Sequence, residues 1–134
     1  MNQSARTARQ TRFLNVDLDI YSRQNLRPLV AALGKSVYPL HVGREGRLWS
    51  AHLELSEAPR DADAAIRKFS ALILLLPKKP REFWDSAETR NFNIGIQAGS
   101  KGKAREFKLS PRAMREASSV TARVVVTVYP SSFA

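Results

Sequence analysis

The 134-residue chain contains no cysteine. Disulfide bonds, thiolate nucleophiles and zinc sites with Cys ligands are therefore excluded. Histidine is scarce as well, with only His41 and His52, and nothing in the spacing places either beside a serine or threonine nucleophile. Two histidines and scattered carboxylates do not form a recognisable ligand set. We therefore expect neither a metal ion nor a cofactor.

Long hydrophobic runs are also absent. The longest one, Ala71–Leu76, ends at Pro77 and is far shorter than the roughly 20 residues of a membrane span. The first dozen residues have no apolar segment of the kind found in a secretory signal. We expect a disordered basic tail over 1–12, one domain over 13–130 and a short C-terminal tail over 131–134. No membrane association is expected, and the bacterial cytoplasm is the expected location.

Acidic residues are few, with 12 Asp and Glu against 22 Lys and Arg, so the net charge is +10. Such a charge favours nucleic acids, anionic membranes and acidic proteins alike. The cations are scattered over the tail, a turn and a loop, and no helix carries a basic stripe. We expect weak, salt-sensitive and non-specific binding of polyanions. The candidate residues for anion binding are Arg6, Arg9, Arg12, Lys101, Lys103 and Arg105.

The chain does contain strands that sort their side chains onto two faces. In Phe13–Ile20, apolar residues alternate with Asn15, Asp17 and Asp19. This period of two is typical of a strand that buries one face. Later segments repeat it, which predicts a sheet covered by helices on one side and polar on the other. The predicted covered face contains Leu14, Val16, Leu18, Trp49, Leu53, Ile94, Ile96 and Val126.

The remaining elements follow from caps, breakers and periodicity. The predicted helices run from Asn25 to Gly34, from Asp61 or Asp63 to Pro77, over Pro80–Arg90, and from Ser110-Pro111 onward. The predicted later strands are Val37–Val42, Leu48–Leu55, Phe92–Ala98, Arg105–Leu109 and Arg123–Tyr129, and the first two form a hairpin with its turn over Gly43–Gly46. The valine-rich last strand is apolar on both faces, which favours a central position. The order β-α-β-β-α-α-β-β-α-β indicates an α+β fold, ferredoxin-like in spirit, with helices on one face of a mostly antiparallel sheet.

The polar sheet face is the best candidate for a binding surface. Its predicted residues are Asn15, Asp17, Asp19, His52, Glu54, Asn93 and Gln97. Carboxylates beside a histidine can also serve a metal site or acid–base catalysis, provided that their strands are neighbours. A solvated sheet face is the more common role of such a pattern. The segment Gly99–Lys103 superficially suggests a phosphate loop, but it lacks the required spacing.

Several landmarks together resemble a known family. They are the opening strand leading to Leu33-Gly34, the amphipathic segment Ala64–Leu76, the segment Phe92–Ile96, and Leu109-Ser110-Pro111 leading to Val124–Tyr129. Over roughly residues 13–130 the chain resembles small bacterial domains of unknown function that are regarded as candidate immunity proteins of polymorphic toxin systems. The resemblance implies binding rather than chemistry, and it assigns no catalytic residue.

Our first hypothesis is therefore a non-enzymatic bacterial domain that binds another macromolecule, with a protein as the partner and an immunity-like or adaptor role. The second hypothesis is a basic nucleic-acid-binding protein. The third is a small enzyme that uses Asp17, Asp19, His52 and Glu54. The sequence leaves the identity of the partner and the oligomeric state open.

Overall fold

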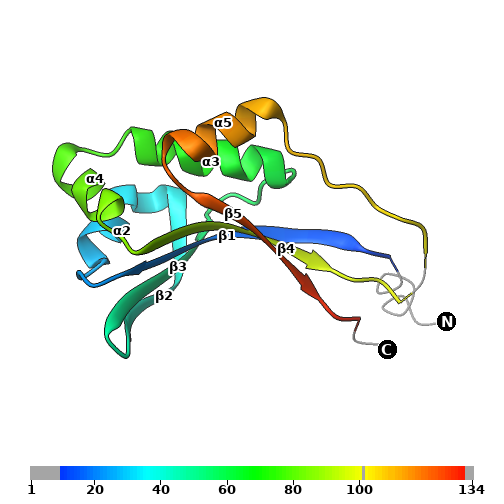
Figure 1. The fold of residues 1–134 in the computed structure, drawn as a ribbon, viewed down its shortest axis with the longest axis horizontal. Coiled ribbons are helices and arrows are strands. Elements are labelled where there is room, and N and C mark those ends of the chain that lie inside the picture. Colours follow the sequence, from blue (N-terminus) through cyan, green and yellow to red (C-terminus); the bar gives the residue numbers. More distant parts are fainter. Residues whose placement is uncertain (1–9, 101, 132–134) are drawn as a thin grey trace.

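The computed structural model describes residues 10–100 and 102–131, and Figure 1 shows helices stacked on one face of a twisted sheet. The strands are β1 (Arg12–Ser22), β2 (Val37–Glu45), β3 (Leu48–Leu55), β4 (Thr89–Gln97) and β5 (Arg123–Tyr129). The helices are α2 (Arg27–Leu33), α3 (Ala62–Leu74), α4 (Lys78–Asp85) and α5 (Pro111–Ser119), with a 3₁₀ turn, η1 (Gly34–Ser36), after α2. No helix in the described part of the chain is long and apolar enough to cross a membrane.

The sheet order is β2-β3-β1-β4-β5, with β1 in the middle. β1 pairs antiparallel with β3 and β4, β2 pairs antiparallel with β3, and only β4 and β5 run parallel. The predicted α+β class, with a mostly antiparallel sheet and helices on one face, is confirmed. The core lies between the sheet and the helices, and Val16, Leu18 and Ile20 of β1 are fully buried in it. Burial of each such side chain contributes about 1.5–3 kcal/mol.

Two helices begin at the capping residues that the sequence predicts. The Asp61 carboxylate accepts a hydrogen bond from the N–H of Ala64, and the Ser110 hydroxyl accepts one from the N–H of Ala113. Each bond satisfies one of the free N–H groups in a first helical turn. The Asp63 carboxylate in turn accepts a hydrogen bond from the backbone N–H of Ser110, which lowers the pKa of Asp63 and joins the starts of α3 and α5.

The prediction for Leu14 is wrong, because β1 contains a bulge. Phe13 pairs with Ile96 of β4, whereas Asn15 pairs with Gly95, so the register shifts between Phe13 and Asn15. A bulge inserts one extra residue and locally breaks the alternation of side chains. Leu14 is therefore 40% exposed, beside Gly95 on the uncovered face, and Phe13 packs against the core in its place.

The prediction of a central position for the last strand is also wrong. β5 lies at the edge of the sheet and pairs only with β4. Val126 stands opposite Ile94, on the helical side of the sheet as predicted, but it is 58% exposed. Val124 is the residue of this row that packs against the core. The helices therefore do not extend over the second half of β5.

The predicted strand Arg105–Leu109 does not form. Residues 102–110 are neither helix nor strand, and they lead from the end of β4 to α5 (Figure 1). The parallel pairing of β4 and β5 explains this, because two parallel neighbours need a crossover that returns the chain to the starting end of the strand. Residues 98–110 and α5 make that crossover, and β5 takes the position beside β4.

Several predicted boundaries shift. The helix predicted over Pro80–Arg90 is α4 at Lys78–Asp85, so Arg90 belongs to β4, which begins at Thr89 rather than at Phe92. β1 begins at Arg12, and the Thr11 hydroxyl accepts a hydrogen bond from the N–H of Gly99, so the ordered chain starts before residue 13. Residues 1–9 of the predicted tail lie outside the described residues. The β2–β3 connection is Gly46-Arg47, with Gly46 in the left-handed region at φ 64°, whereas the sequence placed the turn over 43–46. Glu45 therefore belongs to a strand, which matters for the site.

Candidate functional site

The uncovered face of the sheet holds all seven residues that the sequence predicted for partner binding. The strict alternation of β1, β3 and β4 places them there, opposite the buried residues of the same strands. Figure 1 shows the hairpin tip and the end of β5 bending away from the helices, so that this face is concave. We call it the open face and define it by Asn15, Asp17, Asp19, His52, Glu54, Asn93 and Gln97.

Asp19 is the centre of a polar network on the open face. One of its carboxylate oxygens lies 2.8 Å from Nδ1 of His52 on β3, and the other accepts a hydrogen bond of 3.3 Å from Nδ2 of Asn93 on β4. An ionised carboxylate only accepts, so Nδ1 of His52 carries the proton. The Oδ1 atom of Asn93 accepts a further bond of 2.7 Å from the Thr127 hydroxyl on β5. The Asp19 network therefore joins four strands.

Glu45, at the β2 edge, lies close to both histidines. Oε1 of Glu45 lies 3.9 Å from Nε2 of His52 and 3.8 Å from Nε2 of His41. The two imidazole rings are 5.8 Å apart, and the ring of Tyr21 meets that of His52 edge-on at 5.6 Å. Burial, Asp19 and Glu45 together raise the pKa of Tyr21, so its phenol stays neutral. The hydrogen bond to Asp19 and the edge-on contact with Tyr21 together orient the His52 ring.

Asp17 is different, because its carboxylate has no hydrogen bond or ion pair with any other described residue. Its neighbour Glu54 is occupied, since Oε2 of Glu54 accepts a hydrogen bond of 3.0 Å from Nδ2 of Asn15. Partial burial, and then the nearby charges of Asp19 and Glu54, raise the pKa of Asp17, and His52 offsets this only in part. Asp17 is therefore an open-face carboxylate that no described residue holds by a hydrogen bond or ion pair and whose charge is offset only in part.

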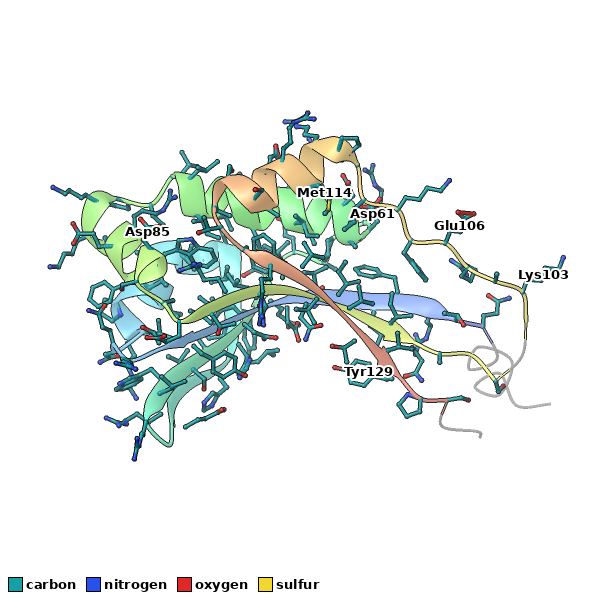
Figure 2. The ribbon with its side chains drawn as sticks, viewed as in Figure 1. Asp61, Asp85, Lys103, Glu106, Met114 and Tyr129 are labelled. Carbon is teal, nitrogen blue, oxygen red and sulfur yellow. The ribbon has the colours of Figure 1, made fainter. Side chains whose placement is uncertain are left out.

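A small recess of about 100 Å³ lies beside Asp17. Gly95 forms part of its floor, and a Cβ atom at this position would stand 3.6 Å from the ring of Tyr129 and 3.7 Å from Cβ of Leu14. Glycine thus leaves this space free. Figure 2 shows Tyr129 on the side of the sheet opposite the labelled helical residues Asp61 and Met114. The lining residues are Leu14, Asn15, Asp17, Asn93, Gly95 and Tyr129.

The seven residues of the open face include three carboxylates and no lysine or arginine, in contrast to the basic chain as a whole. Arg123 of β5 lies on the same side of the sheet, where its Nε donates to Oδ1 of Asn91. Neither Phe13–Ser22 nor β3 contains a lysine or arginine. The one arginine of β4, Arg90, lies on the helical side, where its guanidinium donates to the backbone oxygens of Trp84, Asp85 and Ala87 at the end of α4. The helices carry many of the cations, namely Arg67 and Lys68 on α3, Lys78, Lys79 and Arg81 on α4, and Arg112 and Arg115 on α5.

Of the predicted anion-binding residues, Arg12, Lys103 and Arg105 lie in the described part of the chain, and the hydrogen bond between Thr11 and Gly99 holds the start of β1 beside the segment that follows β4. Arg6, Arg9 and Lys101 lie outside the described residues. Arg12 begins β1 and is exposed, whereas Lys103 and Arg105 are exposed on the crossover, where Lys103 projects away from the sheet (Figure 2). The Arg105 guanidinium lies over the ring of Phe107. A pocket of about 450 Å³ beside Lys35 and Lys68 lies away from the open face.

Sequence reasoning missed four contributors to the open face. Thr127 and Tyr129 belong to a strand interpreted as apolar on both faces, although Arg123, Val125, Thr127 and Tyr129 alternate with three valines and so mark one face. Glu45 was assigned to a turn. His41 was not among the residues predicted for the open face. The alternation in β5 is the signal that could have identified the first two.

The described residues contain no group of three or more His, Asp or Glu side chains that could hold a metal ion. The Asp19–His52 pair is a hydrogen bond within the Asp19 network, which orients both groups. Comparisons of the chain with protein-family models, with curated proteins and with solved structures found no match.

Proposed function

We propose that this protein is a non-enzymatic binding domain whose open face recognises a basic surface on a protein partner. The observation that carries the proposal is Asp17. Its carboxylate is partly desolvated, is repelled by Asp19 and Glu54 with only a partial offset from His52, and forms no hydrogen bond or ion pair with a described residue. A lysine or arginine side chain of a partner supplies the missing charge and regains the free energy that this arrangement costs.

The surroundings of Asp17 support a docked side chain. The adjacent recess of about 100 Å³ is roofed on one side by Tyr129, and Asn15 and Asn93 line it with polar groups. An aromatic ring beside a carboxylate suits the flat guanidinium of arginine or the stem and ammonium of lysine. The recess is shallow and lies on a broad concave sheet, which fits a protein surface with one protruding residue.

The Asp19 network supplies the rigidity that such recognition needs. Asp19, His52 and Asn93 are fixed by their mutual hydrogen bonds, so little side-chain entropy is lost when a partner binds. An immunity-like or adaptor role agrees with this kind of surface. For the immunity-like role, the partner is a toxin domain that presents a basic patch.

The proposal is tested by affinity capture from a lysate of the native organism, using the full chain and two charge-reversal variants. Asp17→Lys changes the open face, and Glu82→Lys makes the same change at an exposed position on α4, in the helical layer. We expect wild type and Glu82→Lys to retain the same protein, and Asp17→Lys to lose it. After purification, the affinity should fall by about tenfold or more in Asp17→Lys.

Salt provides a second criterion. Because the contact pairs opposite charges at a partly exposed site, the affinity of the captured protein should weaken as ionic strength rises. A captured protein that binds Asp17→Lys as tightly as wild type would overturn the proposal. If the chain captures nucleic acid through the cations of the helices or the crossover, and captures no protein whose binding requires Asp17, the nucleic-acid hypothesis would be favoured instead.

A further inference from the structure

The two edges of the sheet are built differently. The β2 edge contains Pro39, a bulge between Pro39 and His41, and the charged pair Arg44-Glu45. Proline, bulges and charges are the usual means by which proteins prevent a free edge from pairing with another chain. From Val124 to Tyr129, β5 contains no charged residue, proline or recorded register shift. The β5 edge therefore lacks the protection that the β2 edge has.

The β5 edge also exposes apolar side chains. Val126 and Val128 are 58% and 60% exposed, on the helical side of the sheet beyond the part that the helices cover. Met114 of α5, in the same helical layer (Figure 2), is 48% exposed. Valine is enriched in strands because its branched side chain packs against a cross-strand neighbour. In the single chain these valines have no such neighbour on their outer side.

The direction of the backbone groups defines how a second strand would pair. The Tyr129 carbonyl accepts a hydrogen bond from the N–H of Ala98, so the backbone of Tyr129 faces β4. In a parallel ladder, alternate residues of a strand bond to the same neighbour. Val125 and Thr127 therefore also face β4. The N–H and C=O groups of Val124, Val126 and Val128 point outward from the edge.

We propose that two copies of this chain pair through their β5 edges in antiparallel orientation, with the two-fold axis at Val126. This register places Val126 of one copy opposite Val126 of the other, and Val124 of each copy opposite Val128 of the other. All three outward-facing residues therefore find hydrogen-bonding partners. The same register brings valines together on the helical side. The arrangement forms one continuous sheet across both copies.

Charge complementarity supports a second copy as the occupant. The antiparallel register places Arg123 of one copy opposite Tyr129 of the other, where a cation meets an aromatic ring and no like charges face each other. Residues 1–9 of the chain are a poor alternative, because their sequence contains no valine, isoleucine, leucine or aromatic residue. The ladder itself is therefore self-complementary in hydrogen bonding, and it brings no like charges together.

The net charge of +10 per copy opposes association at long range. Salt screens this repulsion and leaves the backbone ladder and the apolar contacts largely intact. Dimerisation should therefore strengthen as ionic strength rises. Binding of a basic partner at the open face should weaken under the same conditions, so the two proposals can be tested separately.

Sedimentation equilibrium of the full chain, from low micromolar to several hundred micromolar, tests the proposal. We expect a monomer–dimer equilibrium that tightens with salt. Val126→Lys and Val126→Glu should each weaken dimerisation by about tenfold or more, because each places like charges at the two-fold axis. Leu40→Lys, at an exposed position of the opposite β2 edge, should leave the equilibrium unchanged.

A mixture of the two Val126 variants provides a stringent check. Lysine in one copy then faces glutamate in the other, and a heterodimer should form where neither variant alone dimerises. A measurement on the unmodified protein avoids any effect of substitution on folding: hydrogen exchange at the amides of Val124, Val126 and Val128 should slow as concentration rises. A wild type that stays monomeric throughout, or a dimer that tolerates both Val126 variants, would overturn the proposal.

Discussion

Asp19 and Asp17 lie two residues apart on the same face of β1, and the structure gives them opposite roles. Replacing Asp19 with alanine removes the acceptor for Nδ1 of His52 and for Nδ2 of Asn93. Replacing Asp17 with alanine removes no hydrogen bond between described residues. Asp19→Ala should therefore destabilise the fold, and Asp17→Ala should not.

The size of the Asp19 effect follows from its two bonds. A hydrogen bond to a charged group contributes about 1.5–3 kcal/mol to stability. The side chains of His52 and Asp19 are 26% and 14% exposed, and truncation of Asp19 opens the site to water that replaces these bonds in part, so the lower end of that range applies to each. Removing the charge also relieves the repulsion of Asp17, by about 1 kcal/mol or less. The net loss should be about 2 kcal/mol, which lowers Tm by about 6–10 °C in a domain of this size.

Urea unfolding followed by circular dichroism at neutral pH measures this difference. Asp19→Ala should shift the midpoint to lower urea without changing the slope, because the folded and unfolded surfaces stay the same. Asp17→Ala on the same strand is the matched control. A loss below about 0.5 kcal/mol for Asp19→Ala, well under the contribution of a single charged hydrogen bond, would show that the Asp19 network does not hold the open face together. An equal loss for both variants would refute the assignment of different roles.

Four further outcomes are expected. The pKa of Asp17 in the folded protein is raised above its ordinary value of 3.8, so the folded protein holds this proton more tightly than the unfolded chain does. Stability should therefore fall as pH rises from 3.8 through the raised pKa and Asp17 ionises. Asp17→Asn should therefore raise the urea midpoint at neutral pH, and the gain should vanish below pH 3.8. Leu18→Ala, at a fully buried central position, should cost about 2–5 kcal/mol in the same assay. EDTA should leave Tm unchanged. Fluorescence anisotropy with DNA should show weak binding that falls steeply with salt and is further reduced by neutralising Lys103 and Arg105.

Much of the open face was predictable, because it depends on local alternation. Asp17, Asp19, His52, Glu54 and Asn93 all occupy strand positions whose neighbours in sequence are apolar and buried. Period-two patterning is a property of a short segment, and a sequence displays it directly. The helix caps at Asp61 and Ser110 were predictable as well, because a cap is also recognised within a short segment of sequence.

The features that the sequence did not reveal are long-range. The bulge that turns Leu14 outward depends on how β1 pairs with β4, and no residue type marks it. The edge position of β5 depends on the crossover through α5, since a valine-rich strand is equally compatible with a central place. The contacts of Glu45 with both histidines depend on the register of β2 and β3, which the misplaced turn concealed.

Zero-length cross-linking most directly tests the claim that the open face binds a basic surface of a protein partner. A carbodiimide joins a carboxylate only to an amine in contact with it, so it reports which acidic residue touches a lysine of the captured partner. We predict cross-linked peptides from the open face, at Asp17 or Glu54. In Asp17→Asn, the cross-link at position 17 should be lost. Cross-links confined to acidic residues of the helices and the crossover, such as Glu82, Asp85 or Glu106, would contradict the account.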